Sequence, residues 1–570
     1  MTRRPTDLIY AVDEVPPLPR LVLLGAQHAA LLAVYLVLIV IVMKAGGASH
    51  DETVSAISLG MIAAAVGTVL QALWRGPVGS GYLAAPVFSA IYLGPSMLAA
   101  DHYGLSAVFG MTIFAALVEI IISRFLSRLR VFFPPAISGF IVMIVGIQLG
   151  LVGIDHVLNI GDTSNPHYTR HLIVAGLTLS ITMGFSIWAG GMARLMCSTI
   201  GILSGFLLAI AFGLVGADEL ADAVSGPLLH VPSIGHISYS FELPLAPAFL
   251  IAGIAAALRV VGVVTTCQKI NDEDWKRPQF GPIKGGMLAD GIGCAIGGLM
   301  GCIGQNTGPS LVGVSKASGA TSRYIAFSAG AIMLIFSFFP VVGAMFILLP
   351  KPVIGAALVF TASFMITGGV QIMMSRNIDT RMTYVIGVAL LLGLSREVYS
   401  DFFDSLPTFL QPFSSTALAL AVTSSLVLHL VFRIGTRKSV SVAAADLDET
   451  GPEDLVERLH RQAEQWGLAA DLVERMTTTT QQVLDHLEET RLIHGVLTAT
   501  VSYDDFDLVV AIDYHGVLLS LPNIGVRHHV LVEEESFSYG LADFLTGVYP
   551  DRMESTARGG ACSIRLIFSA

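Results

Sequence analysis

The chain has 570 residues, of which 54% are apolar and only 13% are charged, and its mean hydropathy is +0.71. A soluble domain carries about a quarter charged residues, so these values exclude an ordinary soluble globule and favour a polytopic membrane protein. The five cysteines have no metal-ligand spacing and no nucleophile–base pair appears, which disfavours an enzyme and implies no bound cofactor.

Residues 1–20 come first, and they are charged and contain prolines. They lack an apolar core followed by a small-residue cleavage site, so we expect a cytosolic segment rather than a signal peptide. Apolar segments then recur, many of them long enough to cross a hydrocarbon layer of about 30 Å. They fall roughly at 21–43, 54–74, 82–98, 105–123, 134–154, 171–190 and 195–216, and again at 246–267, 283–300, 305–319, 324–349, 351–373, 380–395 and 412–432.

Lysine and arginine predict the orientation of these segments. With the N-terminus inside, 19 basic residues fall in inside loops, and only Lys44, Arg170, Lys351 and Arg396 fall outside. This bias satisfies the positive-inside rule and favours 14 spans over 13. It places both termini in the cytoplasm, and we expect the cell (inner) membrane of a prokaryote.

An internal repeat divides the segments into two sets of seven. Residues 132–139 read FFPPAISG and residues 348–355 read LLPKPVIG, so Pro134 and Pro350 lie 350 − 134 = 216 residues apart. The same offset carries GCIGQNTGPS at 301–310 onto 85–94, the other Gly/Pro-broken segment. An odd number of spans inverts the second repeat, and paired broken spans in inverted repeats indicate a transporter's binding site near the midplane.

The chain beyond Ser439 has a different composition. It holds 22 acidic residues against eight Arg and no Lys, a net charge of 8 − 22 = −14, whereas the rest of the chain has a net charge of +3. We expect an acidic linker at 439–451 and a small cytosolic α+β domain at 452–570. The fold class is therefore an all-α polytopic membrane protein with two inverted seven-span repeats (21–216 and 246–432, within a transmembrane domain at 21–438), plus this α+β domain.

Several motifs in one order resemble a known family. QNTGPSLVGV at 305–314, GGMLADG at 285–291, GAQHAAL at 25–31, VGSGYLAAPVFS at 78–89 and FPPAISG at 133–139 are similar to motifs of the nucleobase–ascorbate transporters, also called the nucleobase:cation symporter-2 or xanthine/uracil permease family. The resemblance covers about residues 15–435. It implies 14 spans divided into core and gate domains, proton- or sodium-coupled uptake of a purine or pyrimidine base, and a homodimer.

The resemblance also implies site residues. Gln305 and Asn306 match the polar pair that holds the edge of the base, with Gly308 closing the signature, and an amide offers both a donor and an acceptor to that edge. Ser89 matches a serine of the third span and Ala90 stands where the family has an aromatic residue. His28 matches the first-span histidine and Asp290 the ninth-span aspartate, and each has a structural reading beside a role in ion coupling.

Arg259 is the main departure from the family pattern. The stretch LRVVGVVTT places Arg259 where the family has an acidic residue, and Val263 where it has an aspartate. A guanidinium near the midplane is rarely accidental. It would bind an anionic substrate such as urate or a xanthine monoanion, or replace a coupling cation, or form a structural ion pair with Asp290 or Glu119, or extend to the cytoplasmic edge.

The tail has a weaker resemblance of its own. QQVLDHLEE, followed by strand-like runs and IDYHG, is similar to an anti-sigma-factor-type histidine-kinase ATPase fold, with Gln481, Asp485 and Asp513 at its nucleotide-binding positions. The glycine-rich lid is missing beyond Gly516, so we read the domain as degenerate and non-catalytic. A regulatory domain of the kind attached to sulfate transporters is the alternative.

Three functional classes follow. The first is a secondary active nucleobase transporter with elevator-like alternating access. The second is an anion exchanger of the sulfate-transporter type, favoured by Arg259 and disfavoured by QNTG at 305–308. The third is a carrier whose cytosolic domain signals to a protein partner. The expected partners are therefore a small base or organic anion and the lipid bilayer, and no nucleic acid.

Overall fold

The structure is a computed structural model of the whole chain. It describes residues 4–6, 8–129, 134–158, 168–190, 193–194, 196–224, 228–273, 275, 278–374, 378–407, 410–414, 416–432, 438–444, 447–468, 470–490, 492, 497–503, 507–517, 519, 550, 552–558 and 561–569. Two compact units divide the chain, Met1–Leu430 and Val431–Ala570. Each unit is taken by itself below.

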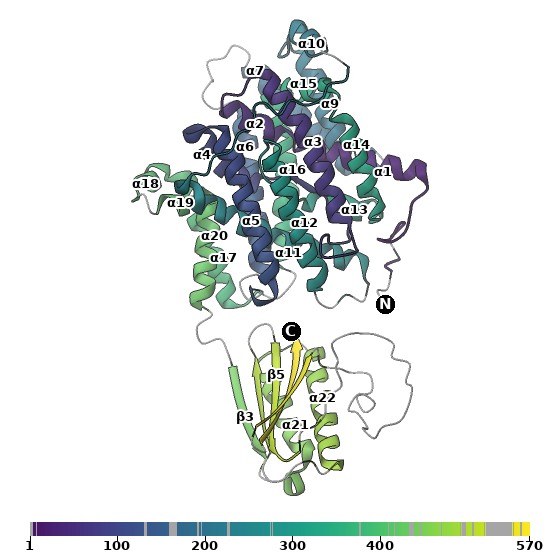
Figure 1. The fold of residues 1–570 in the computed structure, drawn as a ribbon, viewed down its shortest axis with the longest axis vertical. Coiled ribbons are helices and arrows are strands. Elements are labelled where there is room, and N and C mark those ends of the chain that lie inside the picture. Colours follow the sequence, from purple (N-terminus) through teal and green to yellow (C-terminus); the bar gives the residue numbers. More distant parts are fainter. Residues whose placement is uncertain are drawn as a thin grey trace. The chain divides into compact units, whose positions relative to one another are not determined.

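The first unit is helical (Figure 1). Its first half contains α1 (Leu18–Val34), α2 (Val37–Ala45), α3 (His50–Ala72), β1 (Pro86–Phe88), α4 (Ala90–Tyr103), α5 (Leu105–Leu129), α6 (Pro135–Leu158), α7 (Tyr168–Trp188), α9 (Cys197–Ala211) and α10 (Ala217–Val224). Its second half contains a 3-10 turn (Leu243–Leu245), α11 (Ala246–Asn271), α12 (Phe280–Leu299), β2 (Gln305–Thr307), α13 (Pro309–Ala317), α14 (Tyr324–Phe336), α15 (Pro340–Ile347), α16 (Lys351–Met373), α17 (Thr380–Val398), α18 (Ser400–Asp404), α19 (Gln411–Ser414) and α20 (Ala417–Phe432).

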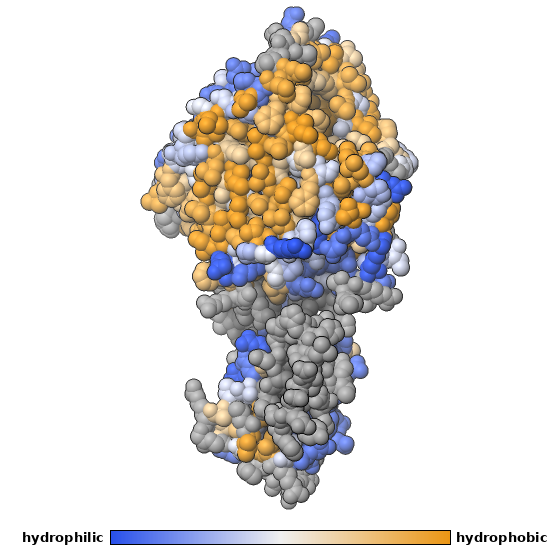
Figure 2. Space-filling model, turned by 45° about the vertical axis from the view of Figure 1, so that its right-hand side comes forward, coloured by the Kyte–Doolittle hydropathy of each residue, from blue (hydrophilic) through white to orange (hydrophobic). Residues whose placement is uncertain are grey.

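These helices are those of a membrane protein. Among the described residues seven helices are long and apolar enough to cross a membrane, or eight if the pair α14 and α15, bent by 87°, is one span. Each of the fourteen apolar segments expected from the sequence contains at least one helix, and the shortest of these helices begin in the two Gly/Pro-broken segments or lie at bends. Large apolar side chains such as Leu117, Ile121 and Leu207 face outward, and Figure 2 shows a broad hydrophobic surface on this unit with hydrophilic residues along its lower edge. An apolar exterior of this kind suits lipid rather than water.

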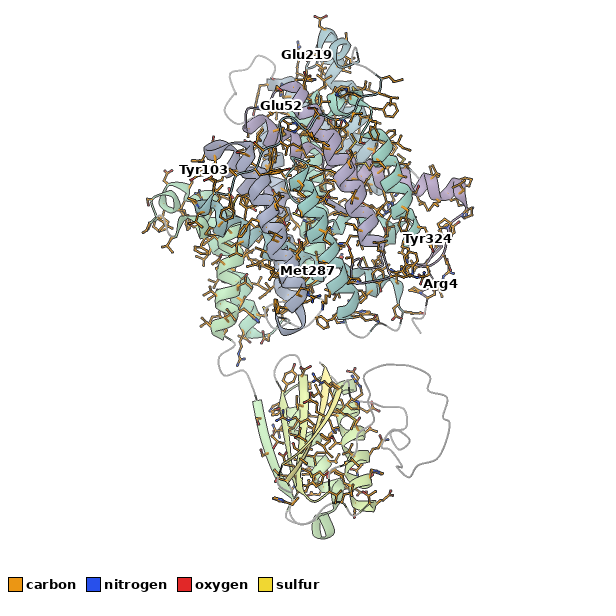
Figure 3. The ribbon with its side chains drawn as sticks, viewed as in Figure 1. Arg4, Glu52, Tyr103, Glu219, Met287 and Tyr324 are labelled. Carbon is orange, nitrogen blue, oxygen red and sulfur yellow. The ribbon has the colours of Figure 1, made fainter. Side chains whose placement is uncertain are left out.

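The ends of the unit carry its polar contacts. At one end Ser49 and Glu52 form a capping box that starts α3. Arg4 and Tyr324 lie at another corner, and Glu52 and Met287 lie toward opposite ends, as Figure 3 shows. Near Arg4, the chain before α1 is held on the α13–α14 connection, because the Ile9 N–H donates to Gly319 O at 2.7 Å and Arg323 pairs with Asp13 at 2.6 Å.

Helices α6 and α16 pack at glycine distance and show the inverted repeat directly. A Cβ on Gly139 would lie 2.6 Å from Gly369 O, and a Cβ on Gly355 would lie 2.6 Å from Gly153 O. The offset of 216 residues relates the two contacts, since 355 − 139 = 216 and 369 − 153 = 216. A two-fold relation between the repeats therefore exchanges these contacts, and small residues allow the two backbones to approach closely, as in other helix pairs in membranes.

The two broken segments cross each other as short antiparallel strands. Strand β1 pairs with β2, with Val87 opposite Asn306. Two further bonds continue the pairing, from Ser89 N to Gly304 O and from Gly308 N to Ala85 O, each 3.0 Å long. These bonds exchange under an offset of 308 − 89 = 219, because 304 − 85 is also 219. The 216-residue offset is therefore three residues short here, and Ser89 corresponds to Gly308 rather than to Gln305.

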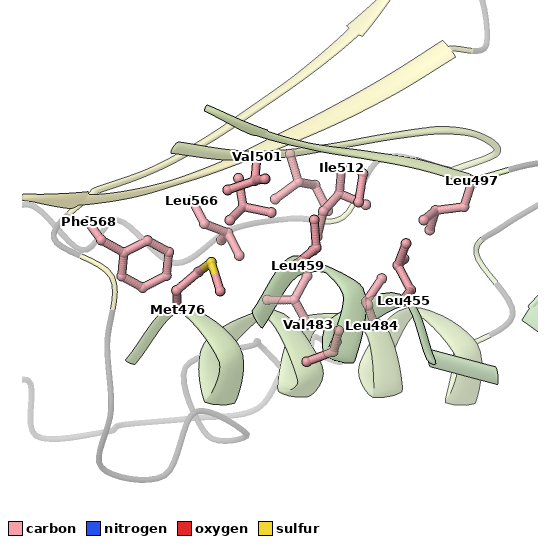
Figure 4. Close-up of a cluster of buried hydrophobic side chains, with 14 of the residues drawn as sticks. Leu455, Leu459, Met476, Val483, Leu484, Leu497, Val501, Ile512, Leu566 and Phe568 are labelled. Atoms are coloured by element: carbon pink, nitrogen blue, oxygen red, sulfur yellow. The ribbon is translucent and has the colours of Figure 1, made fainter. Parts of the chain in front are cut away.

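The second unit is a five-stranded antiparallel sheet with two helices on one face. The strands are β3 (Lys438–Ala444), β4 (Leu497–Tyr503), β5 (Asp507–His515), β6 (Arg552–Arg558) and β7 (Ala561–Ser569), in the order β3-β4-β5-β7-β6, and the helices are α21 (Leu447–Gln465) and α22 (Ala470–Glu489). Leu459, Met476 and Val483 of the helices pack against Val501 and Leu566 of the sheet in one apolar core (Figure 4).

The expected linker at 439–451 is wrong. Strand β3 begins at Lys438 and pairs with β4 through all seven of its residues, and α21 begins at Leu447. The sequence SVSVAAA lacks a long apolar run because β3 lies at the edge of the sheet, where alternation of small and polar residues is sufficient. This part of the chain therefore belongs to the folded second unit.

The three residues with a resemblance to a nucleotide site do not share one face. Leu508, Val510 and Ile512 of β5 point into the core beneath the helices, whereas Asp513 is exposed on the opposite face. Gln481 and Asp485 lie on α22, bonded to each other at 2.8 Å. Alternate residues of a strand point to opposite faces, so this geometry disfavours nucleotide binding of the expected kind.

Candidate functional site

The candidate site lies where the two broken segments meet. Ser89 caps α4 by accepting a hydrogen bond from Ile91 N at 3.2 Å, and Gly308 caps α13 at the equivalent position. The short strand preceding each helix is fully buried. Two helix N-termini therefore begin beside a pair of crossed strands in the interior of the unit, and each carries the positive end of its helix dipole.

Gln305 is held rigidly inside this crossing. Its side-chain amide nitrogen donates to Ala63 O of α3 at 3.2 Å and to Gly293 O of α12. Both partners are carbonyls, so the nitrogen and oxygen of the amide are assigned unambiguously. Gly67 and Gly293 leave the room it occupies, since a Cβ on either would lie 3.2 Å from the amide nitrogen. The amide oxygen, by contrast, is buried without a hydrogen-bond partner.

Asn306 is bound in the same way. Its amide nitrogen donates to Asp290 at 2.6 Å and to Ala256 O at 3.2 Å, whereas its amide oxygen is buried and unpartnered. The second carboxylate oxygen of Asp290 accepts from Thr307 N at 2.8 Å and, more weakly, from Gln71 at 3.5 Å. Asp290 thus joins α12 to β2, which agrees with the structural reading of this residue.

Arg259 points into the same region from α11. Its side chain is buried, and Nη1 donates to Ser89 Oγ at 2.9 Å, which links α11 to the cap of α4. Neither Asp290 nor Glu119 lies within ion-pair distance of it, so the expected structural ion pair is wrong, and so is an extended side chain at the cytoplasmic edge. The Nε and Nη2 atoms of Arg259 are buried without an acceptor.

The other sequence-predicted residues lie around this centre. Ala90 is buried at the first position of α4. His28 bridges α1 and α13, bonded to Leu24 O at 2.9 Å and to Ser315 Oγ at 3.1 Å, so it acts as a packing residue in this conformation. Glu119 of α5 is fully buried and interacts electrostatically with Asp290, and neither of its carboxylate oxygens has a hydrogen-bond partner of normal geometry.

Two residues of the site have no counterpart in the sequence prediction. Tyr35, between α1 and α2, bonds through its hydroxyl to Ser310 Oγ at 2.7 Å, at the first turn of α13. Tyr92 of α4 is fully buried with an unpartnered hydroxyl. A hydroxyl-bearing ring inside an apolar segment is a weak signal at either position, because such tyrosines are common at membrane interfaces as well.

The arrangement therefore offers a mixed set of unused polar atoms. The amide oxygens of Gln305 and Asn306 accept hydrogen bonds, whereas Arg259 donates them. A cavity of about 600 Å³ elsewhere in the unit is lined by Trp74, Trp275, Arg323 and neighbouring residues, and none of the predicted site residues lines it. Among the described residues no group of three or more His, Cys, Asp or Glu could hold a metal ion.

Comparisons with known proteins agree on one family. Residues 19–401 match the xanthine/uracil permease model, which is described as "Permease family", and this match ends before the second unit begins. A protein of Clostridium perfringens that carries the name of a purine permease is 28% identical over 429 residues, covering 75% of this chain and 93% of its own. The xanthine permease XanP of Escherichia coli is 26% identical over 453 residues (75% and 95%). The uric acid transporter UacT of Escherichia coli is 26% identical over 445 residues (75% and 89%).

Among solved structures, the transmembrane domain of the cyanobacterial bicarbonate transporter BicA is similar at 16% identity and a TM-score of 0.42, covering 74% of this chain and 99% of that one. The structure of SLC26A9 is similar at 12% identity and a TM-score of 0.42, covering 72% and 67%.

Proposed function

Because the chain belongs to the xanthine/uracil permease family, we propose that it is a secondary active transporter of nucleobases that binds its base at the crossing of β1 and β2. The family consists of transporters rather than enzymes, and the chain is an integral membrane protein. The relatives named above as purine, xanthine and uric acid transporters support a base of the oxopurine type. The observation that carries the proposal is the set of buried, unpartnered polar atoms on Gln305, Asn306 and Arg259.

These atoms are explained by a ligand. A buried polar atom without a partner destabilises a protein by about 1–3 kcal/mol, so several together at one place require a compensating contact. An oxopurine presents N–H donors and C=O acceptors along its edge. Its N–H groups would bond to the two amide oxygens and a ring carbonyl would accept from Arg259, with Ser89, Ala90 and Gly308 forming the surrounding backbone.

For alternating access we propose an elevator-like movement. The core would contain α1–α5 and α11–α14, which carry every proposed substrate contact. The gate would contain α6, α7, α9, α16, α17 and α20, and within it α6 and α16 pack against each other through glycines. A closely packed α6–α16 pair supplies a firm surface against which a core can shift. Fourteen membrane crossings, cytoplasmic termini, the inner membrane of a prokaryote and a homodimer belong to the same proposal.

The site can be tested by binding. Radiolabelled xanthine should bind saturably to the purified chain, and Asn306→Ala should weaken that binding about tenfold or more, because it removes one acceptor and frees Asp290 from its strongest partner. Thr266→Ala is the matched control on α11, since its hydroxyl bonds only to Gly262 O of its own helix. Equal binding by Asn306→Ala and Thr266→Ala, with both variants folded, would remove Asn306 from the site.

A second candidate is an anion transporter of the sulfate-transporter type. The observation that favours it is the buried guanidinium of Arg259 without a carboxylate partner. Sulfate- or chloride-dependent flux in proteoliposomes, together with no uptake of any base, would favour this candidate over the first. The second unit is proposed as a cytosolic regulatory domain in either case.

A further inference from the structure

The charge at the candidate site is not balanced by the protein. Arginine keeps its proton in proteins, so Arg259 is a cation in the interior of the helical unit. The titratable groups close to it are Tyr35, Tyr92 and Asp290. None of these forms an ion pair with it, and of its three nitrogens only Nη1 has a partner, the neutral hydroxyl of Ser89.

The carboxylates nearby are engaged elsewhere. Asp290 accepts from Asn306 at 2.6 Å and from Thr307 N at 2.8 Å, and these bonds fix both of its oxygens toward β2. Glu119 lies on α5 on the Asp290 side, without a bond to Arg259. An isolated buried charge is strongly unfavourable unless it is paired, so Arg259 lacks a counter-charge that something else must supply.

The backbone adds to the positive charge at this place. Helix α4 begins next to Ser89, the residue that Arg259 contacts, and α13 begins at Gly308 and carries Ser310, which bonds to Tyr35. Both helices present their N-terminal ends, where an anion is stabilised. The guanidinium and the two helix ends therefore favour the same ligand charge.

The two amide oxygens narrow the chemistry of this anion. Gln305 and Asn306 use their amide nitrogens within the protein, so only acceptors remain on them. A sulfate or chloride ion has no N–H group to offer these acceptors. A deprotonated oxopurine has both, namely ring N–H groups and a negatively charged edge.

We propose that the transported species is a monoanionic oxopurine, such as urate, and that Arg259 supplies its counter-charge, so that no cation is co-transported. This inference rests on the proposed function and specifies the substrate class of the same site. The base enters as an anion and each transport cycle moves one negative charge. A protein cation that is part of the site takes the electrostatic role that a bound proton or sodium ion would have.

The test uses the full chain in proteoliposomes, with radiolabelled urate as the anionic base and hypoxanthine as a base that is neutral at neutral pH. We expect urate to bind at least about tenfold more tightly than hypoxanthine, as a charge-assisted bond to arginine would give. Net urate uptake should rise with an inside-positive potential set by potassium and valinomycin. It should not be driven by a proton or sodium gradient when the potential is clamped at zero.

Two variants of Arg259 sharpen the comparison. Arg259→Gln should lower urate affinity about 10- to 100-fold and leave hypoxanthine affinity within about threefold. Arg259→Lys keeps the charge without the planar fork, so it should retain the preference for urate at reduced affinity. Thermal unfolding of each variant reports whether it is folded.

The possible outcomes separate the two proposals. Equal binding of urate and hypoxanthine by the unmodified chain, or urate accumulation driven by a sodium or proton gradient at zero potential, would overturn the inference and leave base transport intact. No binding of either base would overturn both. The measurements on the unmodified chain decide the matter even if Arg259→Gln does not fold.

Discussion

At the scale of single residues, the site is organised by amide groups whose two ends have different tasks. The nitrogens of Gln305 and Asn306 bond to carbonyls and to Asp290, and this fixes the direction of the oxygens. A side chain held in this way loses little further rotamer freedom when a ligand binds, which favours affinity. The unpartnered atoms are therefore pre-organised toward a ligand.

Asp290 and Glu119 provide a matched pair of substitutions on neighbouring helices. Asp290→Asn replaces an acceptor of Asn306 or of Thr307 N by an amide that donates, so we expect a loss of about 1–3 kcal/mol in unfolding free energy. Glu119→Gln removes no bond of normal geometry and should change stability by less than half as much. Thermal unfolding of both variants in detergent makes the comparison, and a larger loss for Glu119→Gln would contradict this view of the Asp290 contacts.

The positions of these residues could be predicted from the sequence, but their partners could not. QNTG at 305–308 stood out because it interrupts an apolar segment. That Ala63 O and Gly293 O take the donors of Gln305 depends on the crossing of α3 and α12, which no local pattern encodes. The absence of an ion pair at Arg259 is likewise a property of the packed structure.

At the scale of elements, the crossing of the broken segments depends on the absence of side chains at particular positions. A Cβ on Gly304 would lie 2.4 Å from the ring of Tyr92, closer than any real contact. Gly304 also accepts the bond from Ser89 N, so a shift here would move the cap of α4.

We expect Gly304→Ala to abolish transport and to lower the melting temperature. Gly313→Ala is the control, because a Cβ at Gly313 of the neighbouring helix α13 meets nothing within 4 Å and a helical alanine is favoured over glycine. Uptake and thermal unfolding are measured for both. Normal transport by Gly304→Ala would show that the crossing tolerates displacement of Tyr92.

The α6–α16 contact gives an equally local test, because α16 has two adjacent glycines. A Cβ on Gly369 would lie 2.5 Å from Met143 N, whereas one on Gly368 meets nothing within 4 Å. Gly369→Ala should therefore separate the helices and destabilise the protein by at least about 1–3 kcal/mol, as overpacking does, and Gly368→Ala should not. Equal unfolding temperatures for the two variants would contradict the close packing.

The repeat was visible in the sequence only in part. The shared proline-containing motifs predict the 216-residue offset that relates α6 to α16. The three-residue difference at the crossing could not be predicted, because it arises from a shorter connection between Gly308 and Pro350 than between Ser89 and Pro134, and glycine and serine share no chemical pattern that would align them.

At the scale of the whole molecule, the chain consists of two units with different surfaces. The first is apolar outside and the second has an apolar core between a sheet and two helices. The change in charge near residue 439 predicts two units. It misplaces the start of the second, because an edge strand of small and polar residues reads like a linker.

We expect residues 431–570 to fold alone as a soluble domain with a single cooperative unfolding transition, since one core of more than twenty buried apolar side chains holds the sheet and helices together. Because β3 begins at Lys438, a truncation that ends after Phe432 should leave the helical unit intact, whereas one that ends at Ala444 should leave an unpaired strand. Circular dichroism and denaturant unfolding test the isolated domain, and a non-cooperative transition would contradict the assignment.

The most direct test of the whole account is base uptake by a host that lacks its own base permeases. Cells expressing the full chain receive radiolabelled xanthine, urate or uracil, and cells with Gly304→Ala at equal membrane abundance serve as the inactive control. The account predicts saturable uptake of at least one oxopurine, competed by the unlabelled base and absent in the control. No uptake of any of the three bases by the correctly inserted chain would contradict it.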